Sequence, residues 1–174
     1  MKRLSRARAS GFTLIELLIV VAIIGLIAAI LIPNMIEALQ KGRQKRTLAD
    51  LRHIGIGLAQ YWTDTSGAAA AGQATVEVGD WEGTTSTDDL ESALVPEYMP
   101  ELPRRDAWGE TIEFRIDLQT PPQSGYAMLR SPGSDGTFEG DSYEPGNFPP
   151  SDYTQDLVWA DGGFVRAPAS SSGT

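Results

Sequence analysis

A single carboxylate near the start of a long apolar segment constrains this chain more than any other feature. Residues 12–32 form a run of 21 residues in which Glu16 is the only charged side chain. As a helix this run would be roughly 31 Å long, which matches the hydrocarbon core of a bilayer. The ten residues before it contain basic side chains and no acid, so we expect the N-terminus in the cytoplasm and the rest of the chain across the membrane. The basic residues are Lys2, Arg3, Arg6 and Arg8.

Two simpler explanations leave part of this pattern unexplained. A secretory signal peptide has a short apolar core and a small-residue cleavage site before polar sequence. Here the apolar run passes directly into residues 33–39, which still have a helical pattern. A plain signal anchor explains the length and the basic leader but not Glu16. An ionised carboxylate within a spanning helix costs about 2.5–3.5 kcal/mol, and such a residue is by default functional.

A partner for Glu16 follows if the chain is cut between Gly11 and Phe12. The new α-amino group would be a cation at the apolar end of the helix. In a bundle of identical helices, Glu16 of one copy would neutralise the amine of another copy. The hypothesis predicts that Glu16→Ala inserts into the membrane but no longer assembles.

Residues 11–24 resemble the class III signal of type IV pilins and type II secretion pseudopilins. The resemblance implies cleavage after Gly11 by a prepilin peptidase, N-methylation of Phe12, and Glu16 as the assembly residue of a helical filament. Pro33 also lies where that family often has a helix-loosening proline.

After the apolar run, the helical pattern continues in amphipathic form to about residue 64. One stripe of apolar side chains recurs at steps of three and four residues, which predicts that this part packs on a globular head. A further helix is expected from Thr87 or Asp88 to Val95, ending at Pro96. The stripe consists of Leu48, Leu51, Ile54, Leu58 and Tyr61.

The rest of the head has the patterns of short strands. The three main candidates are residues 110–118, 126–130 and 157–159, the last with an extension to 165. Residues 75–78 alternate like one more short strand, and residues 121–125 form the turn of a hairpin. With the resemblance, this predicts an α+β, pilin-like fold in which a long N-terminal helix packs on a small antiparallel sheet.

We therefore expect five parts along the chain. They are a cleaved basic leader (1–11), a transmembrane and assembly helix (12–34), an amphipathic helix docking on the head (35–64), a globular periplasmic head (65–166) and a disordered tail (167–174).

Four head segments, residues 94–100, 105–109, 131–136 and 156–159, are similar to the heads of the family's major pseudopilins. In that family the loop after the second strand binds calcium. By resemblance, Asp135 and Asp156 would be carboxylate ligands, and Pro132 would supply a backbone carbonyl. Asp106 and Trp108 are interpreted more simply, as a turn with its aromatic ring in the core.

The composition of the loop gives a separate argument about calcium, which does not use the resemblance. Calcium takes six to eight oxygen ligands, and the loop offers many carboxylates and glycines but no EF-hand spacing. The segment 142–151 is an insertion relative to the family and interrupts the remaining coordination, so Asp141 or Asp152 would replace a missing ligand. An acidic, solvated loop without metal is the alternative.

Composition excludes several functions. From residue 47 onward there are six arginines and 21 acids, a net charge of −15, which is opposite to what nucleic-acid binding needs. There is no cysteine, and the one histidine, His53, is expected on a helix surface. No nucleophile elbow, phosphate loop or zinc-protease motif is present, so we expect no enzyme activity.

Three functions remain. The first is a major-pseudopilin-like filament subunit of a type II secretion system in the bacterial inner membrane. The resemblance implies a homopolymer that works with a prepilin peptidase, minor pseudopilins and an assembly platform with a cytoplasmic ATPase. The second is a type IV pilus subunit, major or minor, for adhesion or motility. The third is a monomeric anchored periplasmic binding module, which would not be cleaved at Gly11.

Overall fold

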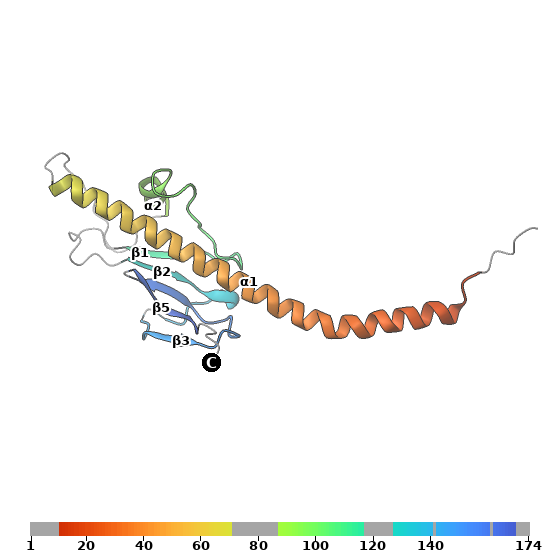
Figure 1. Ribbon diagram of the computed structural model, residues 1–174. Helices are drawn as coiled ribbons and strands as arrows, with labels where there is room; N and C mark the ends of the chain where they lie inside the picture. The colour runs from red at the N-terminus through yellow and green to blue at the C-terminus, as the bar shows by residue number, and fades with distance from the viewer. Residues whose placement is uncertain (1–10, 71–86, 117–126, 141, 161, 170–174) are drawn as a thin grey trace, which may run out of the picture. The chain divides into compact units, whose positions relative to one another are not determined.

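The computed structural model describes residues 11–70, 87–116, 127–140, 142–160 and 162–169 (Figure 1). The chain divides into two compact units, Met1–Leu39 and Gln40–Thr174. The helix α1, Leu14–Ala70, belongs to both. Each unit is considered by itself.

The first unit is the beginning of α1, and its apolar side chains are exposed on all sides. Among the described residues, α1 is the one helix long and apolar enough to cross a membrane, with a mean hydropathy of 3.1 over its most apolar window. None of that window is buried. The helix continues without a break through Pro33. A helix that is apolar all round needs lipid or other apolar helices around it.

In the second unit, α1 buries the predicted stripe. Leu51, Ile54 and Leu58 are fully buried, while Leu48 and Tyr61 pack against the same core. His53 is exposed, as predicted. The helix ends at Ala70, six residues beyond its predicted end, because it runs on into an alanine-rich segment, and alanine is the strongest helix former.

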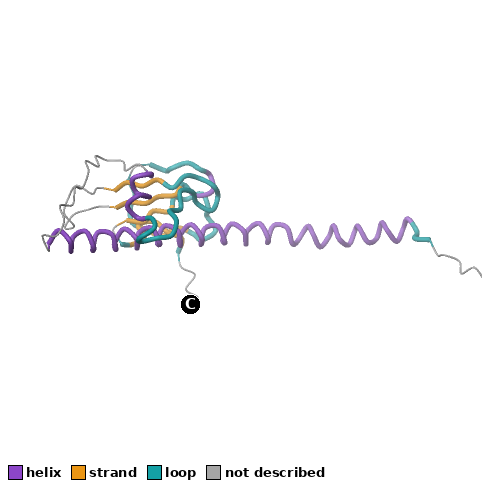
Figure 2. Tube along the Cα trace, turned by 90° about the horizontal axis from the view of Figure 1, so that it is seen from above, coloured by secondary structure: helices purple, strands orange, loops and turns teal. Residues whose placement is uncertain are grey.

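The head contains the helix α2, Thr87–Leu94, and a five-stranded sheet that lies beside the second half of α1 in both views (Figure 2). Leu90 and Leu94 of α2 are buried, and the helix lies where it is predicted. The strand order is β1-β2-β4-β5-β3. The strands are β1 Glu113–Ile116, β2 Ala127–Ser131, β3 Gly146–Phe148, β4 Leu157–Ala160 and β5 Gly163–Pro168, with a 3-10 turn, η1, at Gly133–Asp135.

The sheet confirms the α+β class but corrects the prediction in two respects. It is mixed rather than antiparallel, because β3 pairs in parallel with β5. The sequence did not indicate β3, which lies between β2 and β4 in the chain. With three residues it is too short to show an alternation of apolar and polar side chains. The predicted third strand is in fact a hairpin of two strands, β4 and β5, with Gly162 in the left-handed conformation at its turn (φ 92°).

The predicted tail also begins too early. Ala167 and Pro168 belong to β5, where they pair with Asn147 and Phe148. Ala169 then donates its N–H to the Phe148 carbonyl, 2.8 Å away. Pairing with β3 therefore places these small residues in the sheet. The remaining tail, the predicted strand at 75–78 and the hairpin turn at 121–125 lie outside the described residues.

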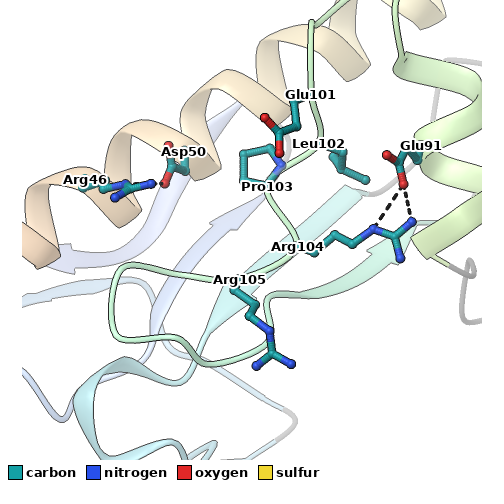
Figure 3. A pocket seen from close by; sticks show the side chains of 8 residues that line it. All are labelled: Arg46, Asp50, Glu91, Glu101, Leu102, Pro103, Arg104 and Arg105. Atoms are coloured by element: carbon teal, nitrogen blue, oxygen red, sulfur yellow. Dashed lines mark hydrogen bonds and ion pairs between the residues drawn. The ribbon is translucent and has the colours of Figure 1, made fainter.

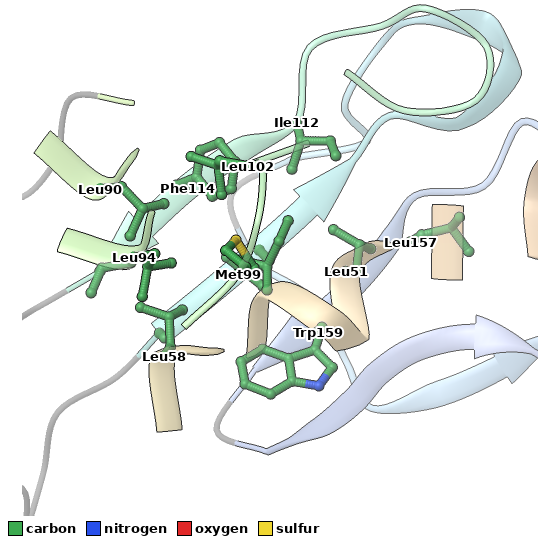
Figure 4. Close-up of a cluster of buried hydrophobic side chains, with 14 of the residues drawn as sticks. Leu51, Leu58, Leu90, Leu94, Met99, Leu102, Ile112, Phe114, Leu157 and Trp159 are labelled. Carbon is green, nitrogen blue, oxygen red and sulfur yellow. The ribbon is translucent and has the colours of Figure 1, made fainter. Parts of the chain in front are cut away.

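The core forms where α1, α2 and the sheet meet (Figure 4). Trp159 of β4 lies directly against Gly55 of α1. A Cβ atom at Gly55 would be 2.6 Å from Cε2 of the Trp159 ring, far inside van der Waals contact. Glycine at this position therefore allows the sheet to approach the helix backbone closely. Buried side chains of this core include Leu51, Ile54, Leu58, Leu90, Leu94, Ile112, Phe114, Leu129, Leu157 and Trp159.

The close approach at Gly55 gives a stability prediction. Gly55→Ala should lower the free energy of unfolding by about 1–3 kcal/mol, because the ring of Trp159 must move. Gly42 lies in the same helix, and a Cβ atom at this position would have no other atom within 4 Å. Gly42→Ala should therefore raise stability by up to about 1 kcal/mol, since alanine favours helix. Urea unfolding of the full chain in detergent measures both, and equal effects would contradict this packing.

Candidate functional site

The predicted cleavage point lies in an exposed, non-helical segment. Residues 11–13 precede α1, and Phe12 is 77 % exposed. A Cβ atom at Gly11 would have no atom within 4 Å. A peptidase needs an accessible backbone at the bond it cuts, and the exposed, non-helical residues Gly11 and Phe12 meet that need.

Glu16 makes a set of hydrogen bonds that closes the start of α1. The N–H and the hydroxyl of Thr13 both donate to Oε2 of Glu16, at 2.9 and 2.8 Å. In return the Glu16 N–H approaches Oγ1 of Thr13 at 3.3 Å. This reciprocal arrangement is a capping box, in which each side chain accepts from the backbone of the other residue.

The capping box corrects one step in the reasoning from sequence. A plain membrane anchor does have a use for Glu16, because its carboxylate accepts the Thr13 N–H, which would otherwise lack a partner at the helix start. The spacing Thr-x-x-Glu at residues 13–16 is the sequence signal for this motif and is sufficient to predict it. The structure thus gives Glu16 a local role beside its predicted role between subunits.

In the head, Asp106 organises the predicted turn. Its Oδ1 accepts the N–H groups of Trp108 and Glu110, both at 2.9 Å, and its Oδ2 accepts the Ser131 hydroxyl at 2.7 Å. Trp108 is partly buried against the core, and its indole N–H donates to Gln40 of α1 at 2.6 Å. The simple interpretation of these residues, a turn with a packed aromatic ring, is confirmed.

The predicted carboxylate ligands among the described residues accept hydrogen bonds from nearby loop groups. Within the part of the chain that the structure covers, no group of three acidic, histidine or cysteine side chains is placed to hold a metal. Asp135 is exposed, and its Oδ1 accepts the Thr137 N–H at 3.1 Å. Asp152 accepts the N–H and hydroxyl of Thr154. Asp141 lies outside the described residues.

Asp156 and Pro132 are buried, as ligands of an internal site would be. Oδ2 of Asp156 accepts two donors, the Tyr143 hydroxyl at 2.5 Å and the Glu139 N–H at 2.9 Å. Oδ1 of Asp156 is buried and has no partner among the described atoms. Burial, together with the hydrogen bond to Asp156, raises the pKa of Tyr143 to about 12, so the phenol keeps its proton at neutral pH. These donors lie on Oδ2 and suit the anion. Among the buried side-chain atoms of the described residues, Oδ1 is the one carboxylate oxygen without a partner. One such oxygen falls far short of the six to eight ligands that calcium takes, so these residues fit calcium poorly.

A polar groove on the head is lined by charged side chains, several of which form ion pairs (Figure 3). Arg104 pairs with Glu91 and Asp88, and its pKa is raised by the hydrogen bonds to these carboxylates. Arg46 lies 3.8 Å from Asp50. Because opposite charges in the lining pair with each other, the groove does not concentrate one sign of charge. The lining residues are Arg46, Asp50, Glu91, Glu101, Leu102, Pro103, Arg104 and Arg105.

Comparison with known proteins connects both parts of the chain to secretion. The family described as "Prokaryotic N-terminal methylation motif" matches residues 6–32. Type II secretion system core protein G of Klebsiella pneumoniae is 30% identical over 136 residues, which cover 76% of this chain and 89% of that protein. The Aeromonas hydrophila protein of the same name is 26% identical over 133 residues, 76% of this chain and 88% of that protein.

A type IV pilin gives a shorter match. Type IV major pilin protein PilA of Myxococcus xanthus is 52% identical over 47 residues, which cover 27% of this chain and 21% of that protein. No solved structure matches the chain.

The methylation motif, the long apolar helix and the small sheet define the class of pilin-like, membrane-anchored subunits. Within that class, the similarity to core protein G covers about three quarters of the chain. It therefore extends into the head, beyond the methylation motif that pilins share. The chain belongs to the family of type II secretion system core protein G.

The turn at Asp106 supports a prediction about the head. Asp106→Ala removes three hydrogen bonds to a buried carboxylate and should lower the free energy of unfolding by about 2–3 kcal/mol. Asp106→Asn keeps one oxygen for the two N–H groups and should cost less. Urea unfolding followed by tryptophan fluorescence measures both variants. An equal loss for the two would mean that the charge, and not the accepted hydrogen bonds, stabilises this turn.

Proposed function

We propose that this chain is the major-pseudopilin-like subunit of a type II secretion system and polymerises into a periplasmic pseudopilus that drives export of folded proteins. The observation that carries the proposal is the similarity to core protein G over both helix and head. The work of the protein is mechanical, and the chain acts as a structural subunit rather than as an enzyme.

Assembly follows from the chemistry of the helix start. Cleavage after Gly11 frees the α-amino group of Phe12, which becomes a cation next to the carboxylate of Glu16. In the single chain this carboxylate is occupied by Thr13. In the filament it exchanges that local cap for the amine of a neighbouring copy, while the apolar surface of α1 packs against other copies instead of lipid.

The place and the partners of the chain follow from the same function. The basic leader holds the N-terminus in the cytoplasm, so the inner membrane carries the helix and the acidic head lies in the periplasm. A prepilin peptidase cuts and methylates the chain. Minor pseudopilins and an inner-membrane platform with a cytoplasmic ATPase then extract and assemble the subunits.

A type IV pilus subunit for adhesion or motility is the second candidate. The high identity to the Myxococcus xanthus pilin over 47 residues favours it. That match covers only about a quarter of the chain, whereas the matches to core protein G also include the head. The pilus function is therefore the weaker of the two.

Substitution at Glu16 separates its charge from its capping role. Glu16→Gln keeps the capping box, because glutamine serves at this position too, but it removes the charge. Both Glu16→Gln and Glu16→Ala should insert and be cleaved normally. Both should lower polymer yield on the order of tenfold or more, since the amine of the neighbour loses its counter-ion. Membrane fractionation, the mass shift on cleavage and the amount of polymer recovered after chemical cross-linking in the cell envelope give the three readouts.

Glu37→Gln is the matched control, because it removes a charge from an exposed position in the same helix. It should assemble like the wild type. Normal polymerisation of Glu16→Gln together with failure of Glu16→Ala would contradict the proposed pairing and leave Glu16 only its role as a cap.

A further inference from the structure

A nearly buried arginine lies under the loop that follows β2. The side chain of Arg130 is only 4 % exposed. Its Nε and Nη2 donate to Oε2 of Glu113 on β1, at 2.8 and 2.6 Å. An unpaired charge at such a depth would cost several kcal/mol, so its remaining donors also need partners.

The loop supplies those partners. Nη1 of Arg130 donates to the Gly140 carbonyl at 2.6 Å and to the Tyr143 hydroxyl oxygen at 3.1 Å. The guanidinium also lies 4.2 Å from the centre of the Phe138 ring, a cation–π distance. Three loop residues therefore cover one buried cation.

The same loop is tied to the last two strands. The Tyr143 hydroxyl donates to Oδ2 of Asp156, immediately before β4, and the Glu139 N–H donates to the same oxygen. The Glu139 carboxylate pairs with Arg166 of β5 at 3.2 Å. Tyr143 thus connects the cation on β2 with the anion before β4 through a single hydroxyl group.

This connection occupies the position where the family resemblance implies calcium. Asp156 is a predicted metal ligand, yet a hydroxyl and an N–H point at its Oδ2, and the positive charge of Arg130 is one hydrogen bond further away. Tyr143 belongs to the insertion 142–151, the part of the loop that departs from the family pattern. The insertion that interrupts the implied calcium ligands therefore also supplies Tyr143, whose hydrogen bonds take their place.

The geometry points to a metal-independent head, in which the chain Glu113–Arg130–Tyr143–Asp156 holds the loop to the sheet in place of a calcium ion. This inference does not depend on which filament the protein builds. It assigns the insertion a structural task and predicts that the subunit is stable where free calcium is scarce.

Thermal unfolding of the full chain in detergent, with excess calcium or with EGTA, tests the inference. The wild type should have the same Tm in both conditions, because a ligand raises Tm only if it binds the native state. In EGTA, Tyr143→Phe should lower Tm on the order of 3–8 °C, since a buried carboxylate loses its hydroxyl donor.

Tyr153→Phe is the matched control, because the Tyr153 hydroxyl is buried and has no partner among the described atoms. It should not lower Tm. A higher wild-type Tm in calcium would overturn the inference, and so would equal Tm values for Tyr143→Phe and Tyr153→Phe. If Tyr143→Phe does not fold, the comparison of the wild type with and without calcium still decides the question.

Discussion

The apolar surface of the first part of α1 is the constraint on which the rest of the protein depends. Large apolar side chains around the whole circumference of residues 14–39 are exposed, and none of them is buried. Only lipid or other copies of the same helix can remove such a surface from water. A subunit with this helix has two stable environments, the membrane and the interior of a filament, and its function is to pass from one to the other.

The two halves of α1 have different side-chain patterns and different packing partners. Before residue 40 apolar side chains lie on all faces of the helix, so it can pack against several neighbours at once. After residue 40 a single stripe enters the head core, with Gly55 allowing Trp159 to lie against the backbone. The head is therefore fixed to its own helix by specific packing, whereas the first half remains available for assembly. The acidic surface of the head favours solubility in the aqueous compartment.

Much of this could be predicted because the signals are local. The apolar run, the stripe at Leu51, Ile54 and Leu58, the helix α2 and the strands β1, β2 and β4 all follow from periodicity within a short window. The capping box of Thr13 and Glu16 is equally local and could have been found from its spacing. In contrast, β3 is only three residues long and takes its parallel pairing from β5, which no local pattern encodes. Tyr143 contacts Arg130 and Asp156, each of which is 13 positions away in the sequence. These contacts form only once the sheet has folded, so no local pattern predicts them.

The central claim is that this subunit serves protein secretion rather than a surface pilus. The most direct measurement is a deletion strain, complemented with the wild-type gene, in which the proteins of the culture medium and the surface filaments are scored side by side. The account predicts loss of secreted proteins while surface filaments remain, with secretion restored by the complementing gene. Loss of surface filaments with an unchanged set of secreted proteins would contradict it and make the chain a pilus subunit.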